Sequence, residues 1–255
     1  MKILVGTSGW SYKGWKGSFY PADLPADDML RHYATRLPAV EINNSFYRIP
    51  RENVLLEWAG QVPPGFRFVL KASRRITHIN RLSGADDSLD YFLRTVNCLG
   101  DRMGPTLFQC PPTLRRNLEL LHDFLGRVPR TWRAAMEFRH DSWFDDEVYD
   151  ALRAHDMALV GVDEDEAATP LVPTATWGYI RLRKTEYGDD ELRAWAERLR
   201  AQPWHEAYVF LKHDDESTAG PDAAVRLTGM VQAHLSPCAE RRGHEPAWPP
   251  SLRSG

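Results

Sequence analysis

The chain has 255 residues, of which 43% are hydrophobic, so it can form one large domain or two small ones around a sizeable core. A formal net charge of −3 excludes a uniformly basic nucleic-acid-coating protein, although charge can still be concentrated locally. No apolar run approaches the ~20 residues of a membrane-spanning helix, and the first residues are too short an apolar stretch for a signal peptide. The cysteines Cys98, Cys110 and Cys238 have no metal-ligand or redox spacing. We therefore expect a reduced, cytoplasmic protein without membrane contact.

Strand-like and helix-like segments alternate along the chain. Short apolar runs predict eight strands, at residues 3–6, 39–43, 67–71, 106–109, 134–138, 159–163, 179–182 and 208–212. Apolar residues at helical spacing predict helices at residues 27–37, 51–61, 87–99, 114–125, 145–155, 189–200 and 223–235. The short, proline-bearing segment 164–174 is expected to be a loop in place of an eighth helix. The proline-rich residues 236–255 predict a disordered tail.

Eight β/α units over ~250 residues predict a closed (β/α)8 TIM-type barrel of parallel strands, a single domain over residues 1–235. An open doubly wound sheet is the alternative. Such a sheet usually has near-continuous apolar strands and a glycine-rich first turn, and the sequence contains no Gly-x-Gly-x-x-Gly. Polar residues at the strand ends also favour the barrel, because closure brings all these ends to one place.

Charged residues or amides recur near the carboxyl ends of the predicted strands. Side chains alternate across a strand, so Val40 and Ile42 share one face while Glu41 and Asn43 share the other. By the same rule we expect Val160 and Val162 to point outward and Asp163 inward. The residues expected at the mouth of the barrel are Glu41, Asn43, Lys71, Gln109, Glu137, Arg139, Asp163, Arg181 and Lys212, with the loop histidines His78, His140 and His213 beside them.

These converging charges favour a ligand site. Burying an ion costs several kcal/mol, and pairing it often only breaks even, while a domain is stable by only ~5–15 kcal/mol. Burying the seven acidic and basic side chains of this set at one end of the barrel would therefore destabilise the domain unless solvent or a ligand compensates their charge. A purely structural salt-bridge network remains the alternative.

Each residue type at the mouth predicts a role. Glu41 and Glu137 are candidates for a paired acid and base, with Asp163 as a further carboxylate; alternatively each glutamate only orients an arginine. Lys71 would stabilise developing negative charge. The cations Arg139, Arg181 and Lys212 suit a phosphate or carboxylate, because guanidinium groups bind such oxygens bidentately.

The first loop, residues 6–17, is rich in glycine and aromatic residues. Its backbone can approach a ligand closely, and we expect Ser8 and Trp10 to contact the substrate, with an aromatic plug over the barrel end as the alternative. Tyr47 and Trp143 would wall the pocket or pack in the core.

No cofactor is indicated by the sequence. A divalent metal is an alternative, since Glu137, His140, Asp163, His213 and Asp214 carry suitable nitrogen and oxygen ligands. No His-Glu-x-x-His occurs, and we assign no residue as a metal ligand.

Several long sequence blocks are distinctive: Gly6-Thr7-Ser8-Gly9-Trp10-Ser11-Tyr12, Phe19-Tyr20-Pro21, Val40 to Arg48, Lys71 with Thr77-His78, Leu107 to Pro112, Glu137 to Trp143, Asp163 and Tyr179-Ile180-Arg181. In these blocks the chain resembles the YecE-like family (domain of unknown function 72), a widespread group of bacterial barrels. The resemblance implies a TIM barrel with an enzyme-like pocket but no particular activity. Many members have His-Gly where this chain has Arg183-Lys184, and Asn-Asn-Asp where it has Lys212-His213-Asp214.

Taken together, the residues predict an enzyme that acts on a small anionic, phosphorylated substrate by carboxylate acid–base chemistry. Two alternatives stay open. One is a metal-assisted nucleic-acid phosphodiesterase or nucleic-acid binder, favoured by the aromatic first loop beside a cationic mouth. The other is a non-catalytic sensor that uses the same pocket. The sequence does not predict the oligomeric state.

Overall fold

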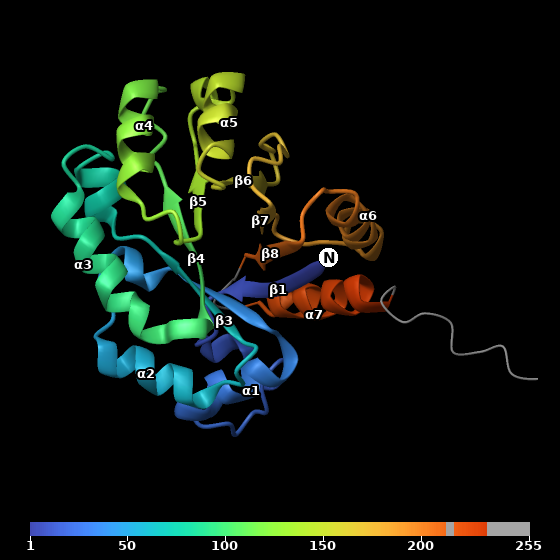
Figure 1. Ribbon diagram of the computed structural model, residues 1–255. Coiled ribbons are helices and arrows are strands. Elements are labelled where there is room, and N and C mark those ends of the chain that lie inside the picture. The colour runs from blue at the N-terminus through green and yellow to red at the C-terminus, as the bar shows by residue number, and fades with distance from the viewer. Residues whose placement is uncertain (213–216, 234–255) are drawn as a thin grey trace, which may run out of the picture.

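The computed structural model describes residues 1–212 and 217–233, and these form a ring of strands surrounded by helices (Figure 1). The predicted tail, residues 236–255, and the loop residues His213 and Asp214 lie outside the described residues. The strands are β1 (Lys2–Ser8), β2 (Ala39–Ile42), β3 (Arg67–Lys71), β4 (Met103–Gln109), β5 (Ala134–Glu137), β6 (Ala158–Asp163), β7 (Trp177–Leu182) and β8 (Glu206–Leu211). The helices are α1 (Met29–Arg36), α2 (Glu52–Gln61), α3 (Asp86–Val96), α4 (Leu118–Arg127), α5 (Asp146–Arg153), α6 (Asp189–Arg200) and α7 (Ala219–Gln232).

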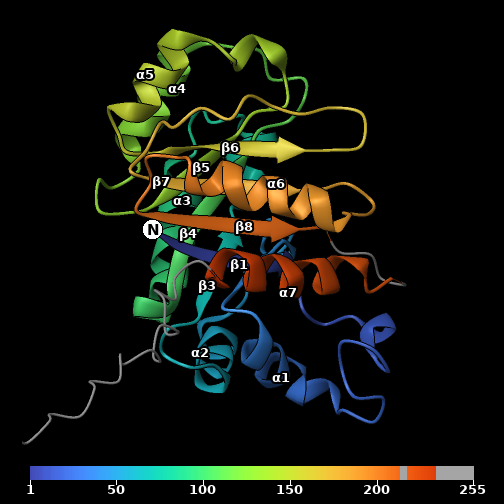
Figure 2. The ribbon, with the colours of Figure 1, turned by 90° about the vertical axis from the view of Figure 1, so that its right-hand side faces the viewer.

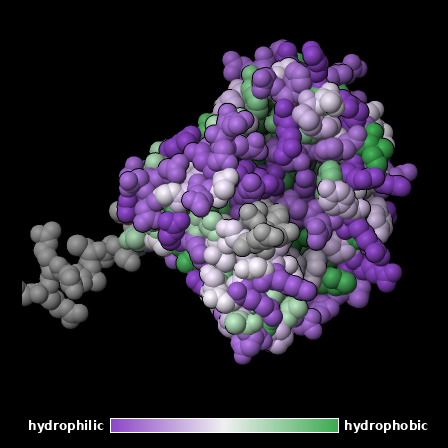
Figure 3. Space-filling view, turned by 180° about the vertical axis from the view of Figure 1, so that it is seen from behind, coloured by the Kyte–Doolittle hydropathy of each residue, from purple (hydrophilic) through white to green (hydrophobic). Residues whose placement is uncertain are grey.

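The strands follow one another around a closed, fully parallel barrel, and β8 pairs back onto β1 from Lys2–Glu206 to Thr7–Leu211. This confirms the predicted TIM-type barrel and excludes the open sheet. In Figure 2 the arrowheads of β6 and β8 point to the same end of the molecule. Figure 3 views the protein from that end and shows a predominantly hydrophilic surface. The carboxyl ends of the strands therefore lie beneath a polar surface. We call this end of the barrel the mouth.

The barrel has two apolar layers because alternate side chains of each strand face inward and outward. The outer layer joins the strands to the helices and includes Phe68, Phe108 and Ile180. The inner layer fills the barrel itself; it consists of Leu4, Ala39, Val69, Leu107, Ala135, Ala158, Val160, Val162, Trp177, Tyr179, Tyr208 and Phe210. The interior is thus a packed core, and polar side chains enter it only near its ends.

The expected orientation of β6 was wrong. Val160 and Val162 belong to the inner layer, and Asp163 points outward, where its Oδ2 accepts a hydrogen bond from Trp195 of α6 at 3.1 Å. Gly161 faces the outer layer, since a Cβ there would lie 2.8 Å from Cδ1 of Ile180. All six residues of β6 are buried. Both faces of the strand therefore carry mainly apolar residues, and the alternation in the sequence does not show which face points into the barrel.

The segment between β6 and β7 contains no helix, as expected. Its threonines instead satisfy the backbone of β6: Oγ1 of Thr174 accepts from the amide of Leu159 at 2.7 Å, and Oγ1 of Thr169 accepts from the amide of Val162 at 2.8 Å. Helix α6 has the predicted bounds, Asp189–Arg200, whereas the other helices start at residues different from the predicted ones. The helix expected from residue 114 begins at Leu118, because the side chain of Asn117 caps it by accepting from the amide of Leu120 at 3.0 Å.

Glycine at position 6 is required by the close approach of β1 to β2. A Cβ at Gly6 would lie 2.0 Å from the carbonyl oxygen of Ala39. We expect Gly6→Ala to lower the free energy of unfolding by about 1–3 kcal/mol through overpacking, measured by denaturant titration.

The matched control is Gly126→Ala. Gly126 lies in α4, and an added Cβ there would have no other atom within 4 Å beyond its own helix backbone and chain neighbours. Alanine there should stabilise the protein by up to about 1 kcal/mol, as it does in helices generally. Equal stabilities of the two variants would contradict the packing constraint at Gly6.

Candidate functional site

One arginine joins two glutamates at the inner end of the mouth. Arg181 of β7 donates from Nη2 to Oε1 of Glu41 on β2 at 2.8 Å and from Nη1 to Oε2 of Glu137 on β5 at 2.6 Å. The exposed fractions of Glu41, Glu137 and Arg181 are 0%, 1% and 2%. We call these three residues the clamp. The clamp links β2, β5 and β7, which are not adjacent to one another in the barrel.

Every oxygen of the clamp carboxylates has a hydrogen-bond donor. Glu41 Oε1 also accepts from Ser8 Oγ at 2.8 Å and from Asn43 Nδ2 at 3.0 Å, and its Oε2 accepts from the Tyr179 hydroxyl at 2.7 Å. Glu137 Oε1 accepts from Gln109 Nε2 at 2.7 Å and from Arg139 Nε at 3.2 Å. The glutamates are therefore fully satisfied as anions.

These contacts lower the pKa of both glutamates. Burial alone would raise the pKa, but the adjacent Arg181 and the hydrogen bonds outweigh it, so the pKa of Glu41 falls from 4.5 to about 2. The pKa of Glu137 is lowered by the same arginine and by Arg139, again against the effect of burial. Both side chains are ionised at neutral pH. Their predicted roles as acid and base stay predictions, and the contacts favour a positioning role.

Lys71 sits next to the clamp and titrates near neutrality. Its Nζ donates to Gln109 Oε1 at 2.8 Å and lies 4.2 Å from the centre of the Phe46 ring. Burial, and then repulsion by Arg181, lowers the pKa of Lys71 from 10.5 to about 8. Gln109 thus connects Lys71 to Glu137, and it holds the ammonium group in place without neutralising it.

Arg183 adds a further cation that sequence reasoning did not include among the site residues. Its Nη1 donates to Ser8 Oγ at 3.3 Å. Burial and the neighbouring Arg181 lower the pKa of Arg183. Tyr179 was missed as well. Both residues could have been found by extending the alternation on β7, because Tyr179, Arg181 and Arg183 are two residues apart.

Among residues 1–212 and 217–233, the charges next to the clamp are unbalanced. The cations are Lys71, Arg139, Arg181 and Arg183, and the anions are Glu41 and Glu137. With all of them ionised, four positive and two negative charges leave an excess of two positive charges. His78 lies at the rim with its ring 4.8 Å from that of Phe46, and its pKa is lowered by burial and by the cations, Lys71 first among them.

Several residues predicted for the site lie elsewhere. Asp163 accepts hydrogen bonds from Tyr187 and Trp195 on the outer side of the barrel. Trp143 is fully buried, stacks on Phe138 with ring centres 4.4 Å apart and donates to the carbonyl of Leu114, so it packs in the core. These two residues are not accessible to a ligand in the mouth.

The remaining predicted residues lie at the periphery. His140 accepts from the amide of Ser142 through Nδ1 at 3.2 Å and so caps a turn. Tyr47 is 73% exposed and Lys212 is also exposed. Trp10 packs edge-on against Trp58 of α2, with ring centres 4.9 Å apart, in a cleft beside the mouth.

A metal site or a membrane-spanning helix does not occur in the part of the chain that the structure describes. Among residues 1–212 and 217–233, no group of three or more His, Cys, Asp or Glu side chains is placed to hold a metal ion. No helix in these ranges has the length and apolar character needed to cross a membrane.

Comparisons with known proteins agree with the fold. The family model described as "Protein of unknown function DUF72" matches residues 4–247. The chain is 27% identical over 253 residues to the UPF0759 protein YecE of Escherichia coli K12, covering 85% of this chain and 88% of YecE. It is also 27% identical over 188 residues to the UPF0759 protein YunF of Bacillus subtilis, covering 68% of this chain and 64% of YunF.

Solved structures with the same architecture include two DUF72 family proteins. A crystal structure from Thermotoga maritima matches 91% of this chain and 100% of its own chain, with a TM-score of 0.80 and 26% identity. One from Enterococcus faecalis matches 95% and 100%, with a TM-score of 0.75 and 19% identity, which supports the fold alone.

Removal of the clamp arginine should expose the cost of two unpaired buried carboxylates. We expect Arg181→Met to lower the free energy of unfolding by about 3–5 kcal/mol at pH 7. Arg139→Met is the control, because the Arg139 side chain is 41% exposed, and its pair with Glu137 should contribute no more than about 1 kcal/mol. Similar losses for the two variants would contradict the clamp.

The same clamp predicts a pH dependence. A carboxyl whose folded pKa is depressed stabilises the protein above its unfolded pKa, and that stability is lost as the pH falls through the folded pKa. For Glu41 the window runs from pH 4.5 down to about 2. Chemical unfolding across this range should show wild-type stability falling, and the gap to Arg181→Met closing. A gap that is independent of pH would contradict the assignment.

Proposed function

The chain belongs to the DUF72 family of proteins of unknown function, and from that premise we propose that it is an enzyme whose mouth binds a small anionic substrate. The observation that carries this proposal is the unbalanced charge. Both carboxylates of the mouth are used by Arg181, while Lys71 and Arg183 donate to the neutral oxygens of Gln109 and Ser8. Within the part of the chain that the structure describes, neither cation forms a salt bridge with a carboxylate, and two such partly buried cations favour a ligand that supplies negative charge.

A phosphate or carboxylate group fits these cations best. Arg183 and Arg139 offer planar guanidinium groups, which bind such oxygens bidentately, and Lys71 offers a compact ammonium group. A cleft of about 260 Å³ reaches Glu137 and Arg139 from the side of β6. Its described lining also includes the carboxylates Asp141 and Glu164 and does not include Lys71 or Arg183, so the proposal rests on the cations and not on this cleft.

Lys71 is the residue to which we assign proton transfer. A general base works best when its pKa lies near the working pH, and a carboxylate with a pKa of about 2, as for Glu41, is a weak base. The pKa of Lys71, about 8, is much closer to neutrality. The glutamates then act indirectly: Glu137 orients Gln109, and Gln109 holds the Lys71 ammonium group.

Sulfate is a suitable probe of the mouth, because its charge does not change near neutral pH. We expect Arg183→Met to weaken sulfate binding about tenfold or more, the usual effect of losing a charged hydrogen bond. Affinity in the wild type should also fall as the pH rises through about 8, where Lys71 loses its proton, and this dependence should disappear in Lys71→Met. Calorimetric titration measures both effects.

The control is Arg193→Met on α6, which removes the same charge from an exposed ion pair with Asp190. Absence of sulfate binding, or equal losses in Arg183→Met and Arg193→Met, would reject the anion site. A screen of phosphate esters and carboxylic acids for turnover then separates an enzyme from a sensor, which would bind without converting any of them.

Nucleic-acid binding is a second candidate, favoured by one surface next to the mouth. A cleft of about 540 Å³ between the segment after β2 and α3 is lined by Tyr47, Arg48, Ile49, Arg51, Ser73, Arg75, Asp87, Ser88 and Tyr91. Tyr47 and Tyr91 are 73% and 58% exposed. Exposed aromatic rings among arginines are typical of surfaces that stack bases and hold the phosphate backbone of single strands.

For this second candidate, Tyr47→Ala and Tyr91→Ala should each weaken binding of a single-stranded oligonucleotide by about 1–3 kcal/mol. Leu56→Ala, at another exposed apolar side chain, should have no effect. Affinity should also fall steeply with salt. Fluorescence anisotropy at low ionic strength is the measurement, and no detectable binding there would eliminate nucleic acid as a ligand.

A further inference from the structure

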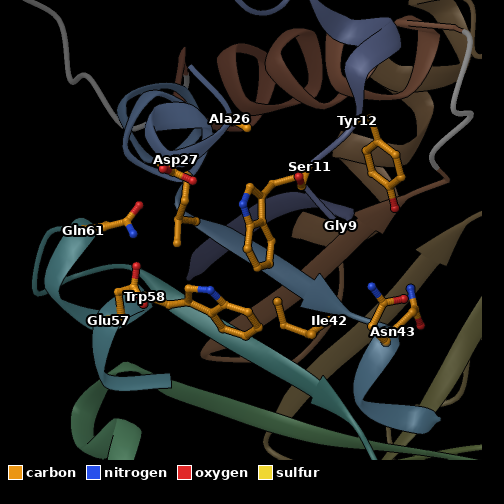
Figure 4. Close-up of a pocket in the computed structure, with 13 residues that line it drawn as sticks. Gly9, Ser11, Tyr12, Ala26, Asp27, Ile42, Asn43, Glu57, Trp58 and Gln61 are labelled. Carbon is orange, nitrogen blue, oxygen red and sulfur yellow. The ribbon is translucent and has the colours of Figure 1, made fainter. Parts of the chain in front are cut away.

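A second cleft lies beside the mouth, between the first loop and helices α1 and α2. Its volume is about 560 Å³, and it is lined by Gly9, Trp10, Ser11, Tyr12, Ala26, Asp27, Leu30, Ile42, Asn43, Asn44, Glu57, Trp58 and Gln61. Figure 4 shows Glu57 and Gln61 at one end of this group and Asn43 at the other, with Trp58 and Ile42 between them. The proposed reaction in the mouth uses none of these side chains except Asn43.

The polar lining of the cleft includes carboxylate and amide oxygens that can accept hydrogen bonds. Asp27 and Glu57 contribute carboxylates, and no lysine or arginine is among the described residues that line the cleft. Two amide oxygens, Oδ1 of Asn43 and Oε1 of Gln61, are buried and accept no hydrogen bond. The orientation of Asn43 is fixed, because its Nδ2 donates to Glu41 Oε1 at 3.0 Å and its oxygen therefore remains free. Buried acceptors of this kind are normally satisfied.

The apolar lining is aromatic. Trp10 and Trp58 meet edge to face with ring centres 4.9 Å apart, and both are partly exposed. Indole rings are the best aromatic partners for organic cations. The cleft thus combines negative charge, unpaired acceptors and indole rings, whereas the mouth next to it has an excess of positive charge.

From this combination we propose that the cleft binds an organic cation that carries N–H donors, of the guanidinium or ammonium class. Its positive charge lies between Asp27 and Glu57 and against the indoles, and an N–H group donates to Gln61, which lies at the same end of the cleft as Glu57 (Figure 4). An anion is disfavoured by the two carboxylates. A neutral sugar would gain no electrostatic attraction from the two carboxylates. The proposal is independent of the anion site in the mouth.

The test is calorimetric titration at pH 7 and low salt with methylguanidinium, tetramethylammonium and glucose. Methylguanidinium has both charge and N–H donors, tetramethylammonium has charge without donors, and glucose has hydroxyl groups, which donate and accept, without charge. We expect methylguanidinium to bind at least about tenfold more tightly than either of the others, since it alone combines attraction to the carboxylates with charge-assisted hydrogen bonds. Equal affinity for tetramethylammonium, or no binding of methylguanidinium at millimolar concentration, would overturn the proposal.

The double variant Asp27→Asn/Glu57→Gln locates the site. Both residues are exposed, so the fold should be preserved, and sulfate binding in the mouth should remain. We expect methylguanidinium affinity to fall at least about tenfold, the effect of losing charge-assisted hydrogen bonds. The control, Glu119→Gln/Asp123→Asn, removes the same charge from exposed positions of α4 and should bind as the wild type does. Unchanged affinity in the cleft variant would place the cation elsewhere and reject the proposal.

Discussion

The pairing of Arg181 with Glu41 and Glu137 is the interaction on which the arrangement of the mouth depends. Three charges with almost no exposure are held at the end of a hydrophobic barrel, where each would be strongly unfavourable alone. Their mutual contacts fix the carboxylates as anions. The two carboxylates then accept hydrogen bonds from neighbouring side chains: Glu41 from Ser8, Asn43 and Tyr179, and Glu137 from Gln109. Polar residues of several strands are thereby ordered around one guanidinium group.

The charged residues of the mouth have different roles in this arrangement, although the sequence alone does not distinguish them. The glutamates neutralise Arg181 and have little remaining capacity for a ligand. Lys71 and Arg183, by contrast, donate to the neutral oxygens of Gln109 and Ser8, and among the described residues they form no salt bridge. Asn43 belongs to both regions, because its amide nitrogen faces the clamp and its oxygen is free beside the acidic cleft. Regions of opposite charge thus share one side chain, and a ligand with groups of both signs would match them.

Much of the fold could be predicted from the sequence, because alternation and helical spacing are local signals. Glu41, Lys71, Gln109, Glu137 and Arg181 were placed correctly, since each follows an apolar neighbour on a strand with one polar face. Asp163 was misplaced because β6 is buried on both faces, so its alternation does not show which face points inward.

Pairing between side chains of distant strands is not a local property, so the sequence did not predict that one arginine would pair with both glutamates. The acidic cleft was also missed, because it brings together Trp10 and Trp58 from distant segments.

The helix-free connection after β6 has a consequence for motion in the ring. Strands β5 and β6 are in register at Ala135–Ala158 and Met136–Leu159, while β8 follows β1 from Lys2 to Thr7. Beyond Leu159, hydroxyl groups of the connecting segment replace strand partners for β6. Segments held by few backbone bonds are the first to open in a native protein. Among the strand pairs of the barrel, β5–β6 is therefore the one expected to open first, and amide exchange within the barrel strands should be fastest there, beside Glu137.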